Sequence, residues 1–190
     1  MIDPEKQFTK DGIRREMRVM RKAVTPDQRA SVSDVICAKL LRHPDVQVAI
    51  LDRTPIAVYI ASKDEIDLTG FINAAMEKGA LLVAPRWNGS VYELAPFRSL
   101  DDLVPGPHAI PEPPAPAINW QRPRFVLFIT PGLAFTVDGK RIGYGGGWYD
   151  RLFASGDSCS VKLGVAYHFQ LVDDIPIEPH DILLDEIVTE

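Results

Sequence analysis

The chain has 190 residues, of which 46% are hydrophobic and 25% charged, a composition that favours one globular domain and argues against disorder throughout. The formal net charge of −5 argues against nucleic-acid binding by bulk electrostatics. No stretch is long and apolar enough to span a membrane, and the polar residues 1–9 lack the apolar segment of a signal peptide. The two cysteines, Cys37 and Cys159, have no metal or redox spacing. These features predict a cytoplasmic protein that binds neither nucleic acid nor membranes. The net charge does not decide between monomer and dimer, and we expect a monomer.

Two helices are predicted in the first part of the chain. Apolar residues at helical spacing, among them Ile13 and Met17, predict a helix over residues 4–24. Thr25 and Gln28 have the spacing of a capping box, which predicts a second helix directly afterwards. A solvated helix face is the default interpretation of the basic residues in the first helix, and an anion site is the alternative. These residues are Lys10, Arg14, Arg15, Arg18, Arg21 and Lys22.

A βαβ pattern follows. Residues 56–60 are a continuous apolar run rich in β-branched side chains, which is typical of a buried strand of a parallel sheet. We expect a helix over about residues 67–78 and a second strand over residues 81–84. Asn88–Gly89 then predicts a tight turn into a strand over residues 91–94.

The second half of the chain continues the same fold class. Residues 105–123 are rich in proline, so we expect an ordered surface loop or an extended crossing there. Further strands are predicted over residues 125–129, 161–167 and 187–188. The pattern predicts a single α/β domain over residues 1–190, with a mostly parallel central sheet and helices on both faces. In such sheets, ligands bind at the carboxyl ends of the strands.

The most informative segment follows the strand over residues 125–129. Four glycines within five residues precede an amphipathic segment that can begin a helix, a combination that lets backbone N–H groups approach a phosphate; they are Gly143, Gly145, Gly146 and Gly147. Arg141 and Asp150 bracket the loop and are suited to phosphate and to Mg²⁺. The alternative is a flexible turn, but Tyr144, Trp148 and Tyr149 favour a binding site. The residues alone therefore predict an anion or phosphate site that is neither a Walker A loop nor a dinucleotide fingerprint.

Other kinds of site find no support. The sequence has no G-x-S-x-G elbow, no H-E-x-x-H motif and no paired cysteines, so neither a serine hydrolase nor a zinc site is indicated. Asp150 could share a Mg²⁺ ion with one acidic residue near the C-terminus, because Mg²⁺ takes few protein carboxylates and relies on phosphate oxygens and water. The candidates are Asp173, Asp174, Asp181, Asp185 and Glu186.

Several segments in this order resemble the 5-formyltetrahydrofolate cyclo-ligase family, also called methenyltetrahydrofolate synthetase, over nearly the whole chain. The most specific segment is the run of glycines, aromatics and Asp150 over residues 141–151. The other segments are residues 13–17 with Arg21 and Thr25–Pro26, then residues 64–67, 105–107, 110–113, 131–135, 178–181 and 184–190. One departure is Trp148, where the family usually has tyrosine, so a contact of the tyrosine hydroxyl would be lost.

The resemblance implies a three-layer α/β fold and the ATP- and Mg²⁺-dependent conversion of 5-formyltetrahydrofolate to 5,10-methenyltetrahydrofolate, with release of ADP and phosphate. It implies that Lys10, Arg14 and Arg141 are catalytic cations and that Asp150 and Asp185 are the metal-linked carboxylates. The ATP-binding positions that it implies are Lys10, Asp11, Gly12, Ile13, Arg14, Arg141, Ile142, Gly143, Tyr144, Gly145, Gly146, Gly147, Trp148 and Tyr149. The folate-binding positions are Ile60, Glu65, Tyr144, Gly145, Gly146, Gly147 and Trp148.

The expected chemistry needs no covalent nucleophile from the protein. The formyl oxygen of the folate would attack the γ-phosphoryl group of ATP, and N10 of the folate would then attack the activated carbon and close the ring as phosphate leaves. The protein would align the substrates and stabilise charge. Two alternatives stay open: a divergent member that uses the nucleotide site on another substrate, and a non-catalytic folate-binding protein.

Overall fold

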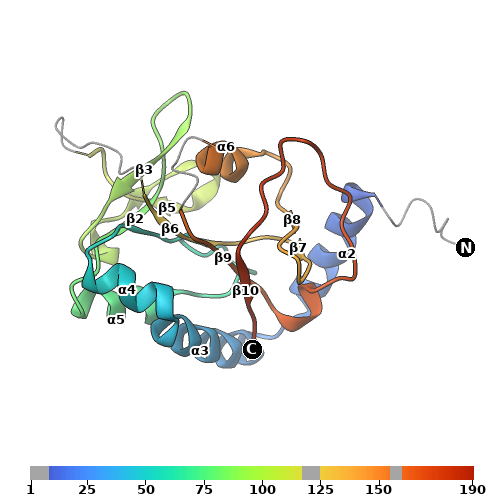
Figure 1. The fold of residues 1–190 in the computed structure, drawn as a ribbon, viewed down its shortest axis with the longest axis horizontal. Coiled ribbons are helices and arrows are strands. Elements are labelled where there is room, and N and C mark those ends of the chain that lie inside the picture. The colour runs from blue at the N-terminus through green and yellow to red at the C-terminus, as the bar shows by residue number, and fades with distance from the viewer. Residues whose placement is uncertain (1–8, 117–124, 155–159) are drawn as a thin grey trace, which may run out of the picture.

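A six-stranded sheet forms the centre of the computed structural model in Figure 1, which describes residues 9–116, 125–154 and 160–190. Its strands are β1 (Ile56–Ala57), β2 (Leu82–Trp87), β3 (Tyr92–Pro96), β6 (Leu127–Thr130), β9 (Lys162–Val165) and β10 (Glu186–Val188). They are ordered β10-β9-β6-β1-β2-β3, and neighbours are parallel except for the antiparallel pair of β2 and β3. The mostly parallel sheet predicted from the sequence is confirmed.

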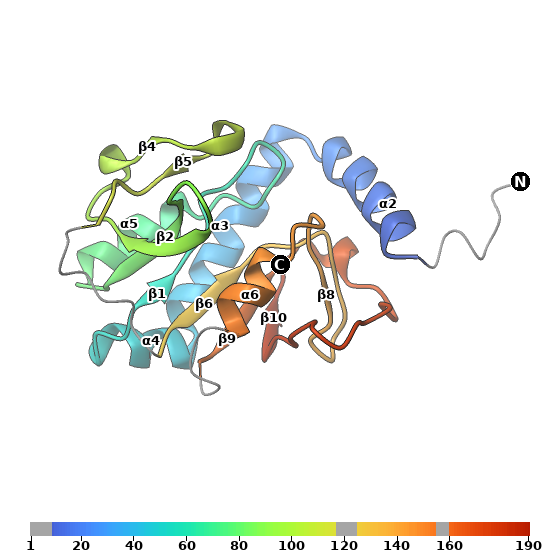
Figure 2. The same cartoon turned by 90° about the horizontal axis from the view of Figure 1, so that it is seen from above.

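Helices cover both faces of this sheet and make three layers, as expected (Figure 2). One face carries α3 (Pro26–Arg42), α4 (Pro44–Leu51) and α5 (Thr69–Glu77). Leu40 and Phe71 from these helices are fully buried in one core cluster with Ile56 of the sheet. On the opposite face lies α6 (Trp148–Ala154), whose Phe153 ring meets Phe128 of β6 edge to face at 5.0 Å.

The helix α2 (Lys10–Ala23) packs away from the sheet. Its buried Ile13 and Met17 contact a small hairpin of β7 (Ala134–Phe135) and β8 (Arg141–Ile142). This hairpin leads directly into the glycine-rich loop. The basic helix and the glycine-rich loop therefore lie next to each other, although more than a hundred residues separate them in the chain.

Local signals in the sequence set several boundaries as predicted. Thr25 caps α3 in a capping box with Gln28, since each accepts a hydrogen bond from the backbone N–H of the other. Gly89, with φ of 100°, makes the turn between β2 and β3. The predicted start of the first helix, residues 4–8, lies outside the described parts of the chain. Within them α2 begins at Lys10, where the extended Thr9 caps it by accepting from Gly12 N.

Other elements differ from the prediction. Residues 44–51 form α4, which was not predicted; Pro44 suits its first turn and the His43 side chain accepts from Asp45 N. The proline-rich segment contains the short pair β4 (Val104–Pro105) and β5 (Pro111–Glu112), and its residues 117–124 lie outside the described chain. The remaining short elements are the 3₁₀ helices η1 (Leu100–Asp102), η2 (Pro107–Ala109) and η3 (His168–Gln170).

Strand β1 also ends earlier than the predicted limit at residue 60. Strand β1 is assigned only to Ile56–Ala57, although Val58 N still donates to the carbonyl oxygen of Val83 at 2.9 Å. Beyond Val58, the Tyr59 hydroxyl donates to the carbonyl oxygen of Ile66 at 2.8 Å. In the described parts of the chain, no helix has the length and apolarity needed to cross a membrane.

The topology creates one crevice at the centre of the sheet. From β1 the chain passes through α5 to β2, whereas from β6 it passes through α6 to β9 on the other side. The connections leaving β1 and β6 therefore diverge, and ligands bind outside the carboxyl ends of strands at such a switch point.

Candidate active site

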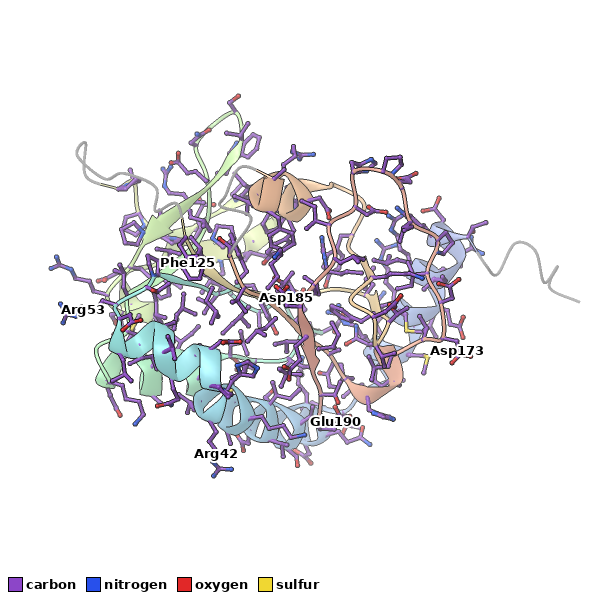
Figure 3. The ribbon with its side chains drawn as sticks, viewed as in Figure 1. Arg42, Arg53, Phe125, Asp173, Asp185 and Glu190 are labelled. Atoms are coloured by element: carbon purple, nitrogen blue, oxygen red, sulfur yellow. The ribbon has the colours of Figure 1, made fainter. Side chains whose placement is uncertain are left out.

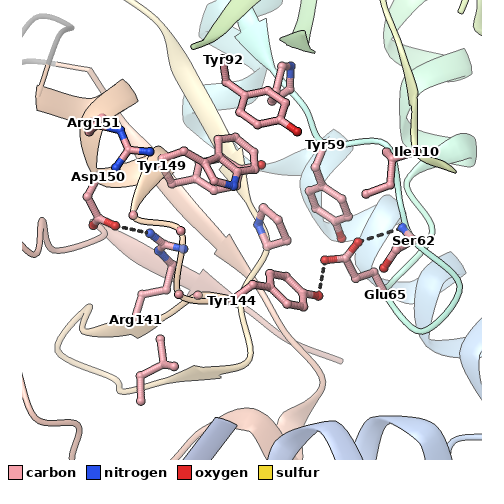
Figure 4. A pocket seen from close by; sticks show the side chains of 18 of the residues that line it. Tyr59, Ser62, Glu65, Tyr92, Ile110, Arg141, Tyr144, Tyr149, Asp150 and Arg151 are labelled. Carbon is pink, nitrogen blue, oxygen red and sulfur yellow. Dashed lines mark hydrogen bonds and ion pairs between the residues drawn. The ribbon is translucent and has the colours of Figure 1, made fainter. Parts of the chain in front are cut away.

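A cavity of about 770 Å³ lies at this switch point (Figure 4). Its walls come from α2, from the loop after β1, from the β2–β3 hairpin, from the segment over residues 107–112, from the glycine-rich loop and from Glu178, His180 and Asp181 near the C-terminus. This volume lies within the range typical of small-molecule sites. The glycine-rich loop contributes every residue from Arg141 to Arg151, so it forms the largest continuous wall.

The glycine-rich loop needs glycine at two positions. Gly145 and Gly147 have φ of 107° and 60°, in the left-handed region that glycine enters without strain. The Arg14 side chain on α2 crosses the loop, and its Nε donates to the carbonyl oxygen of Gly143 at 3.1 Å. Helix α6 begins at Trp148, directly after the last glycine. The predicted loop-to-helix arrangement is therefore present, with an arginine of α2 fixed to its first glycine.

Arg141 and Asp150 form a nearly buried ion pair at one end of the cavity. Arg141 Nη2 lies 3.1 Å from Asp150 Oδ2, and the two side chains are 5% and 16% exposed. The guanidinium group also lies 5.3 Å from the centre of the Tyr149 ring. Arg141 Nε is buried without a hydrogen-bond partner in the described parts of the chain. A buried donor of this kind is costly unless a ligand satisfies it, so Arg141 is suited to bind an anionic group.

Lys10 also lies in the cavity wall and is paired with carboxylates. Its Nζ lies 2.6 Å from Asp181 Oδ2 and 3.1 Å from Glu178 Oε2. Burial of the ammonium group works against its charge, but the two carboxylates hold the pKa of Lys10 above its usual value. Burial likewise opposes the charge of Asp181, whose pKa is nevertheless lowered by Lys10. Glu178, His180 and Asp181 offer ligand atoms within 4.8 Å of one another, but Lys10 already occupies two of these side chains.

A different arrangement surrounds Glu65 at the other end of the cavity. Glu65 is 8% exposed, and its carboxylate accepts from Ser62 N at 2.8 Å and from the Tyr144 hydroxyl at 2.6 Å. In Figure 4, Glu65 points toward Ser62 and the Tyr144 hydroxyl, and these three residues lie on the other side of the cavity from the pair of Arg141 and Asp150. Burial, and then the negative charge of Glu65, raise the pKa of Tyr144 well above its usual value, so the hydroxyl stays protonated.

Arg21 completes this second group, although the sequence predicts no binding role for it. The default interpretation of Arg21 as part of a solvated helix face is wrong, because the residue is 5% exposed. Its Nη1 donates to the Tyr144 hydroxyl at 2.6 Å and its Nε to the carbonyl oxygen of Asp64 at 3.0 Å. Arg21 lies seven residues after Arg14, which is about two helical turns, so both residues lie on the same side of α2. This spacing was the signal in the sequence that Arg21 faces the site together with Arg14.

Aromatic side chains line the cavity beside the glycine-rich loop. Trp148 stacks on Tyr149 with ring centres 4.0 Å apart and on Tyr92 with ring centres 4.9 Å apart. Trp87 lies next to Tyr92 at 5.1 Å, at the end of the β2–β3 hairpin. Trp87 and Tyr92 were not predicted from the sequence as residues of the site. The signal that could have found them is their position on either side of the Asn88–Gly89 turn, which pairs them across the hairpin.

The structure gathers most of the residues implied by the resemblance. Those that line the cavity are Lys10, Arg14, Ile60, Glu65, Arg141, Ile142, Gly143, Tyr144, Gly145, Gly146, Gly147, Trp148, Tyr149 and Asp150. Asp11, Gly12 and Ile13 lie on α2 outside the lining, and Ile13 is buried against the β7–β8 hairpin.

Asp185 (labelled in Figure 3) also lies outside the cavity lining. Its Oδ2 accepts from Lys162 N at 2.7 Å and pairs with Lys162 Nζ at 3.2 Å. Of the two predicted metal-linked carboxylates, the structure therefore puts only Asp150 in the wall of the cavity.

A crevice at the carboxyl ends of parallel strands, with cationic side chains at one end and a buried carboxylate at the other, defines a small-molecule-binding α/β protein. A family model described as the 5-formyltetrahydrofolate cyclo-ligase family matches residues 6–190, and the chain belongs to this family of ligases.

Individual relatives agree with this assignment. The chain is 28% identical to 5-formyltetrahydrofolate cyclo-ligase of Escherichia coli over 179 residues, which cover 91% of this chain and 96% of the relative. It is 24% identical to a probable 5-formyltetrahydrofolate cyclo-ligase of Caenorhabditis elegans over 95% of this chain and 92% of the relative. Among solved structures, the 5,10-methenyltetrahydrofolate synthetase of Aquifex aeolicus superimposes with a TM-score of 0.78 at 28% identity, covering 95% of this chain and 89% of that one.

Proposed function

We propose that the protein cyclises 5-formyltetrahydrofolate to 5,10-methenyltetrahydrofolate, with ATP as the co-substrate and Mg²⁺ as the metal cofactor. The observation that carries this proposal is a single cavity with two chemically different ends. One end presents the cations Arg14 and Arg141 beside the glycine-rich loop, and the other presents the carboxylate of Glu65. An enzyme that transfers the γ-phosphoryl group of ATP to a folate and releases ADP must hold both substrates in one enclosure.

At the cationic end, the chain's own residues would bind and neutralise phosphate groups. Arg141 Nε is a buried donor without a protein partner in the described residues, and Arg14 is already fixed to the first glycine of the loop. Lys10 would exchange its carboxylate partners, Asp181 and Glu178, for phosphate oxygens. Three cations around the γ-phosphoryl group would stabilise the charge that develops during its transfer.

Asp150 is the residue best suited to hold Mg²⁺ in this cavity. One of its carboxylate oxygens pairs with Arg141, and within the described parts of the chain the other accepts a long hydrogen bond of 3.4 Å from Ile182 N and no shorter one. A carboxylate with spare acceptor capacity next to a phosphate site fits the few protein ligands that Mg²⁺ takes. Mg²⁺ would supply charge neutralisation on the phosphate oxygens. Asp185 lies outside the cavity lining. It would be linked to Mg²⁺, as predicted, only if the metal site extended beyond this lining.

At the opposite end, Glu65 would accept hydrogen bonds from donor atoms of the pterin ring. Its two carboxylate oxygens accept from Ser62 N and from the Tyr144 hydroxyl, and these hydrogen bonds fix its orientation. The stacked aromatic side chains of Trp148 and Tyr92 line the cavity and would pack against the rest of the folate. Stacking survives the exchange of tyrosine for Trp148, because an indole also has a flat face.

We further propose that residues 1–190 form one catalytic unit that works as a monomer in the cytoplasm, without nucleic-acid or membrane partners. The negative net charge argues against nucleic-acid binding by bulk electrostatics.

A turnover assay tests the function directly. Purified protein is mixed with 5-formyltetrahydrofolate and Mg-ATP, and the near-UV absorbance of the methenyl product is followed. We expect a rise that requires both ATP and Mg²⁺ and that stops when Mg²⁺ is chelated. ATP binding without any rise would favour a different substrate, and folate binding without ATP binding would favour a non-catalytic folate-binding protein.

A further inference from the structure

Arg21 is the one basic side chain of α2 that is fully withdrawn from solvent in the described structure. It is 5% exposed, whereas Arg15 and Arg18 on the same helix are exposed. A buried guanidinium group costs free energy unless its donors are satisfied. In the described residues it makes no direct ion pair, and it donates instead to three uncharged oxygens: the carbonyls of Asp64 and Gly132, at 3.0 and 3.5 Å, and the hydroxyl of Tyr144, at 2.6 Å.

The hydrogen bond from Arg21 to Tyr144 fixes the donor-to-acceptor direction of a chain of hydrogen bonds. A guanidinium group can only donate, so the Tyr144 hydroxyl must accept from Arg21 and has its single proton left for another partner. That partner is Glu65 Oε1, 2.6 Å away. Without Arg21, the hydroxyl could rotate and offer its proton elsewhere. The chain of hydrogen bonds therefore runs in one direction, from Arg21 as donor through the Tyr144 hydroxyl to Glu65 as acceptor.

The same chain of hydrogen bonds holds the Glu65 carboxylate in one orientation. Its second oxygen, Oε2, accepts from Ser62 N at 2.8 Å, so both oxygens are held from opposite sides. Glu65 is also buried, and the positive charge of Arg21 reaches it through one intervening hydroxyl group. A carboxylate that is oriented before the ligand arrives loses less conformational entropy on binding.

Helix α2 holds two consecutive residues of the glycine-rich loop by two arginines. Arg14 Nε donates to the carbonyl oxygen of Gly143, and Arg21 donates to the side chain of the next residue, Tyr144. The seven-residue spacing keeps both arginines within about 20° of each other around the helix axis. Arg14 therefore serves the cationic end of the cavity while Arg21 serves the carboxylate end.

We propose that Arg21 is a positioning residue that, through the Tyr144 hydroxyl, holds Glu65 in the orientation that receives the pterin ring of the folate. This inference rests on the proposed function, because it assigns Arg21 a task in the folate half of that site. Arg21 itself is not part of the cavity lining.

Calorimetric titration of the full-length protein provides the test. Affinities for 5-formyltetrahydrofolate without nucleotide, and for Mg-ATP without folate, are measured for the wild type, Arg21→Met and the matched control Arg18→Met. We expect Arg21→Met to weaken folate binding by about tenfold while Mg-ATP binding changes less than about twofold. Arg18→Met, one turn earlier on the exposed side of α2, should leave both affinities unchanged.

A double-mutant cycle separates positioning from general structural support. Because Arg21 acts through Tyr144, the combination of Arg21→Met with Tyr144→Phe should weaken folate binding no more than the larger of the two single changes. Additive losses, or equal losses of folate and Mg-ATP affinity, would overturn the inference. If Arg21→Met does not fold, Arg21→Lys replaces it, and the expectation is that Arg21→Lys weakens folate binding in the wild type but has no further effect in the Tyr144→Phe background.

Measurements on the wild type distinguish a failure of the positioning role of Arg21 from a failure of the proposed function. If the wild type binds and converts 5-formyltetrahydrofolate and Arg21→Met binds it equally well, the positioning role fails and the function stands. If the wild type neither binds nor converts this folate, the proposed function fails and the positioning role fails with it.

Discussion

The two ends of the cavity hold their charges in different ways. At the cationic end, Lys10 and Arg141 are each paired directly with carboxylates that also line the cavity, namely Asp181, Glu178 and Asp150. At the other end, Glu65 is held by uncharged donors, Ser62 N and the Tyr144 hydroxyl. An anionic ligand must displace protein carboxylates at the first end, whereas at the second end the receptor group is already in place. The comparison predicts that binding rearranges ion pairs at the cationic end and changes little around Glu65.

The largest effect should come from removing the cation with the unsatisfied donor. Arg141→Ala should lower kcat by roughly two to three orders of magnitude, because Arg141 would stabilise charge in the transition state. Steady-state kinetics with the absorbance assay measure this, and Arg98→Ala, an exposed arginine outside the cavity, is the control. Near-normal turnover in a folded Arg141→Ala protein would remove Arg141 from the mechanism.

The next effect distinguishes the two predicted metal-linked carboxylates. Asp150→Asn should lower Mg²⁺ affinity by about 10- to 100-fold, a range seen for the loss of groups that support a metal site. Asp185→Asn should have a smaller effect, because Asp185 lies outside the cavity lining and pairs with Lys162. Titrations of activity with Mg²⁺ compare the two variants. Equal losses would show that the metal site reaches from Asp150 to Asp185.

A smaller and more selective effect is expected at the opposite end. Glu65→Gln should raise the KM for 5-formyltetrahydrofolate by about tenfold and leave the KM for ATP within about twofold, because a neutral amide accepts hydrogen bonds less strongly than a carboxylate. The measurement is a pair of substrate titrations. Parallel increases in both KM values would indicate that Glu65 supports the structure of the whole cavity.

The smallest effect concerns the Lys10–Asp181 pair and its pH dependence. The pKa of Asp181 is lowered below its usual value of 3.8, so its stabilising contribution is complete above that pH and is lost as the pH falls through the lowered pKa. The pKa of Lys10 is raised above 10.5, so its contribution is lost only as the pH rises beyond that value. Thermal unfolding below pH 4 should therefore show a smaller acid-induced loss in Asp181→Asn than in the wild type, by less than about 1 kcal/mol. An identical acid dependence in both proteins would mean that the pair contributes nothing to folding.

The sequence alone allowed the prediction of features that depend on neighbouring residues. The Thr25 capping box, the Asn88–Gly89 turn and the α/β order of elements follow from local chemistry, and the structure confirms them. The burial of Arg21 could not be obtained in this way. It depends on which side of α2 meets Tyr144, a residue 123 positions later in the chain. The pairing of Lys10 with Asp181 is of the same kind, since 171 positions separate them.

The position of α2 also has a consequence for how the chain assembles during synthesis. Its apolar side chains Ile13 and Met17 pack on the β7–β8 hairpin, and Lys10 pairs with residues 168 and 171 positions further along. A helix with such distant partners leaves the ribosome long before they do, and contacts of long sequence separation form slowly. We therefore expect α2 to dock late, after the sheet has formed, so that the cavity is completed in one of the last folding events.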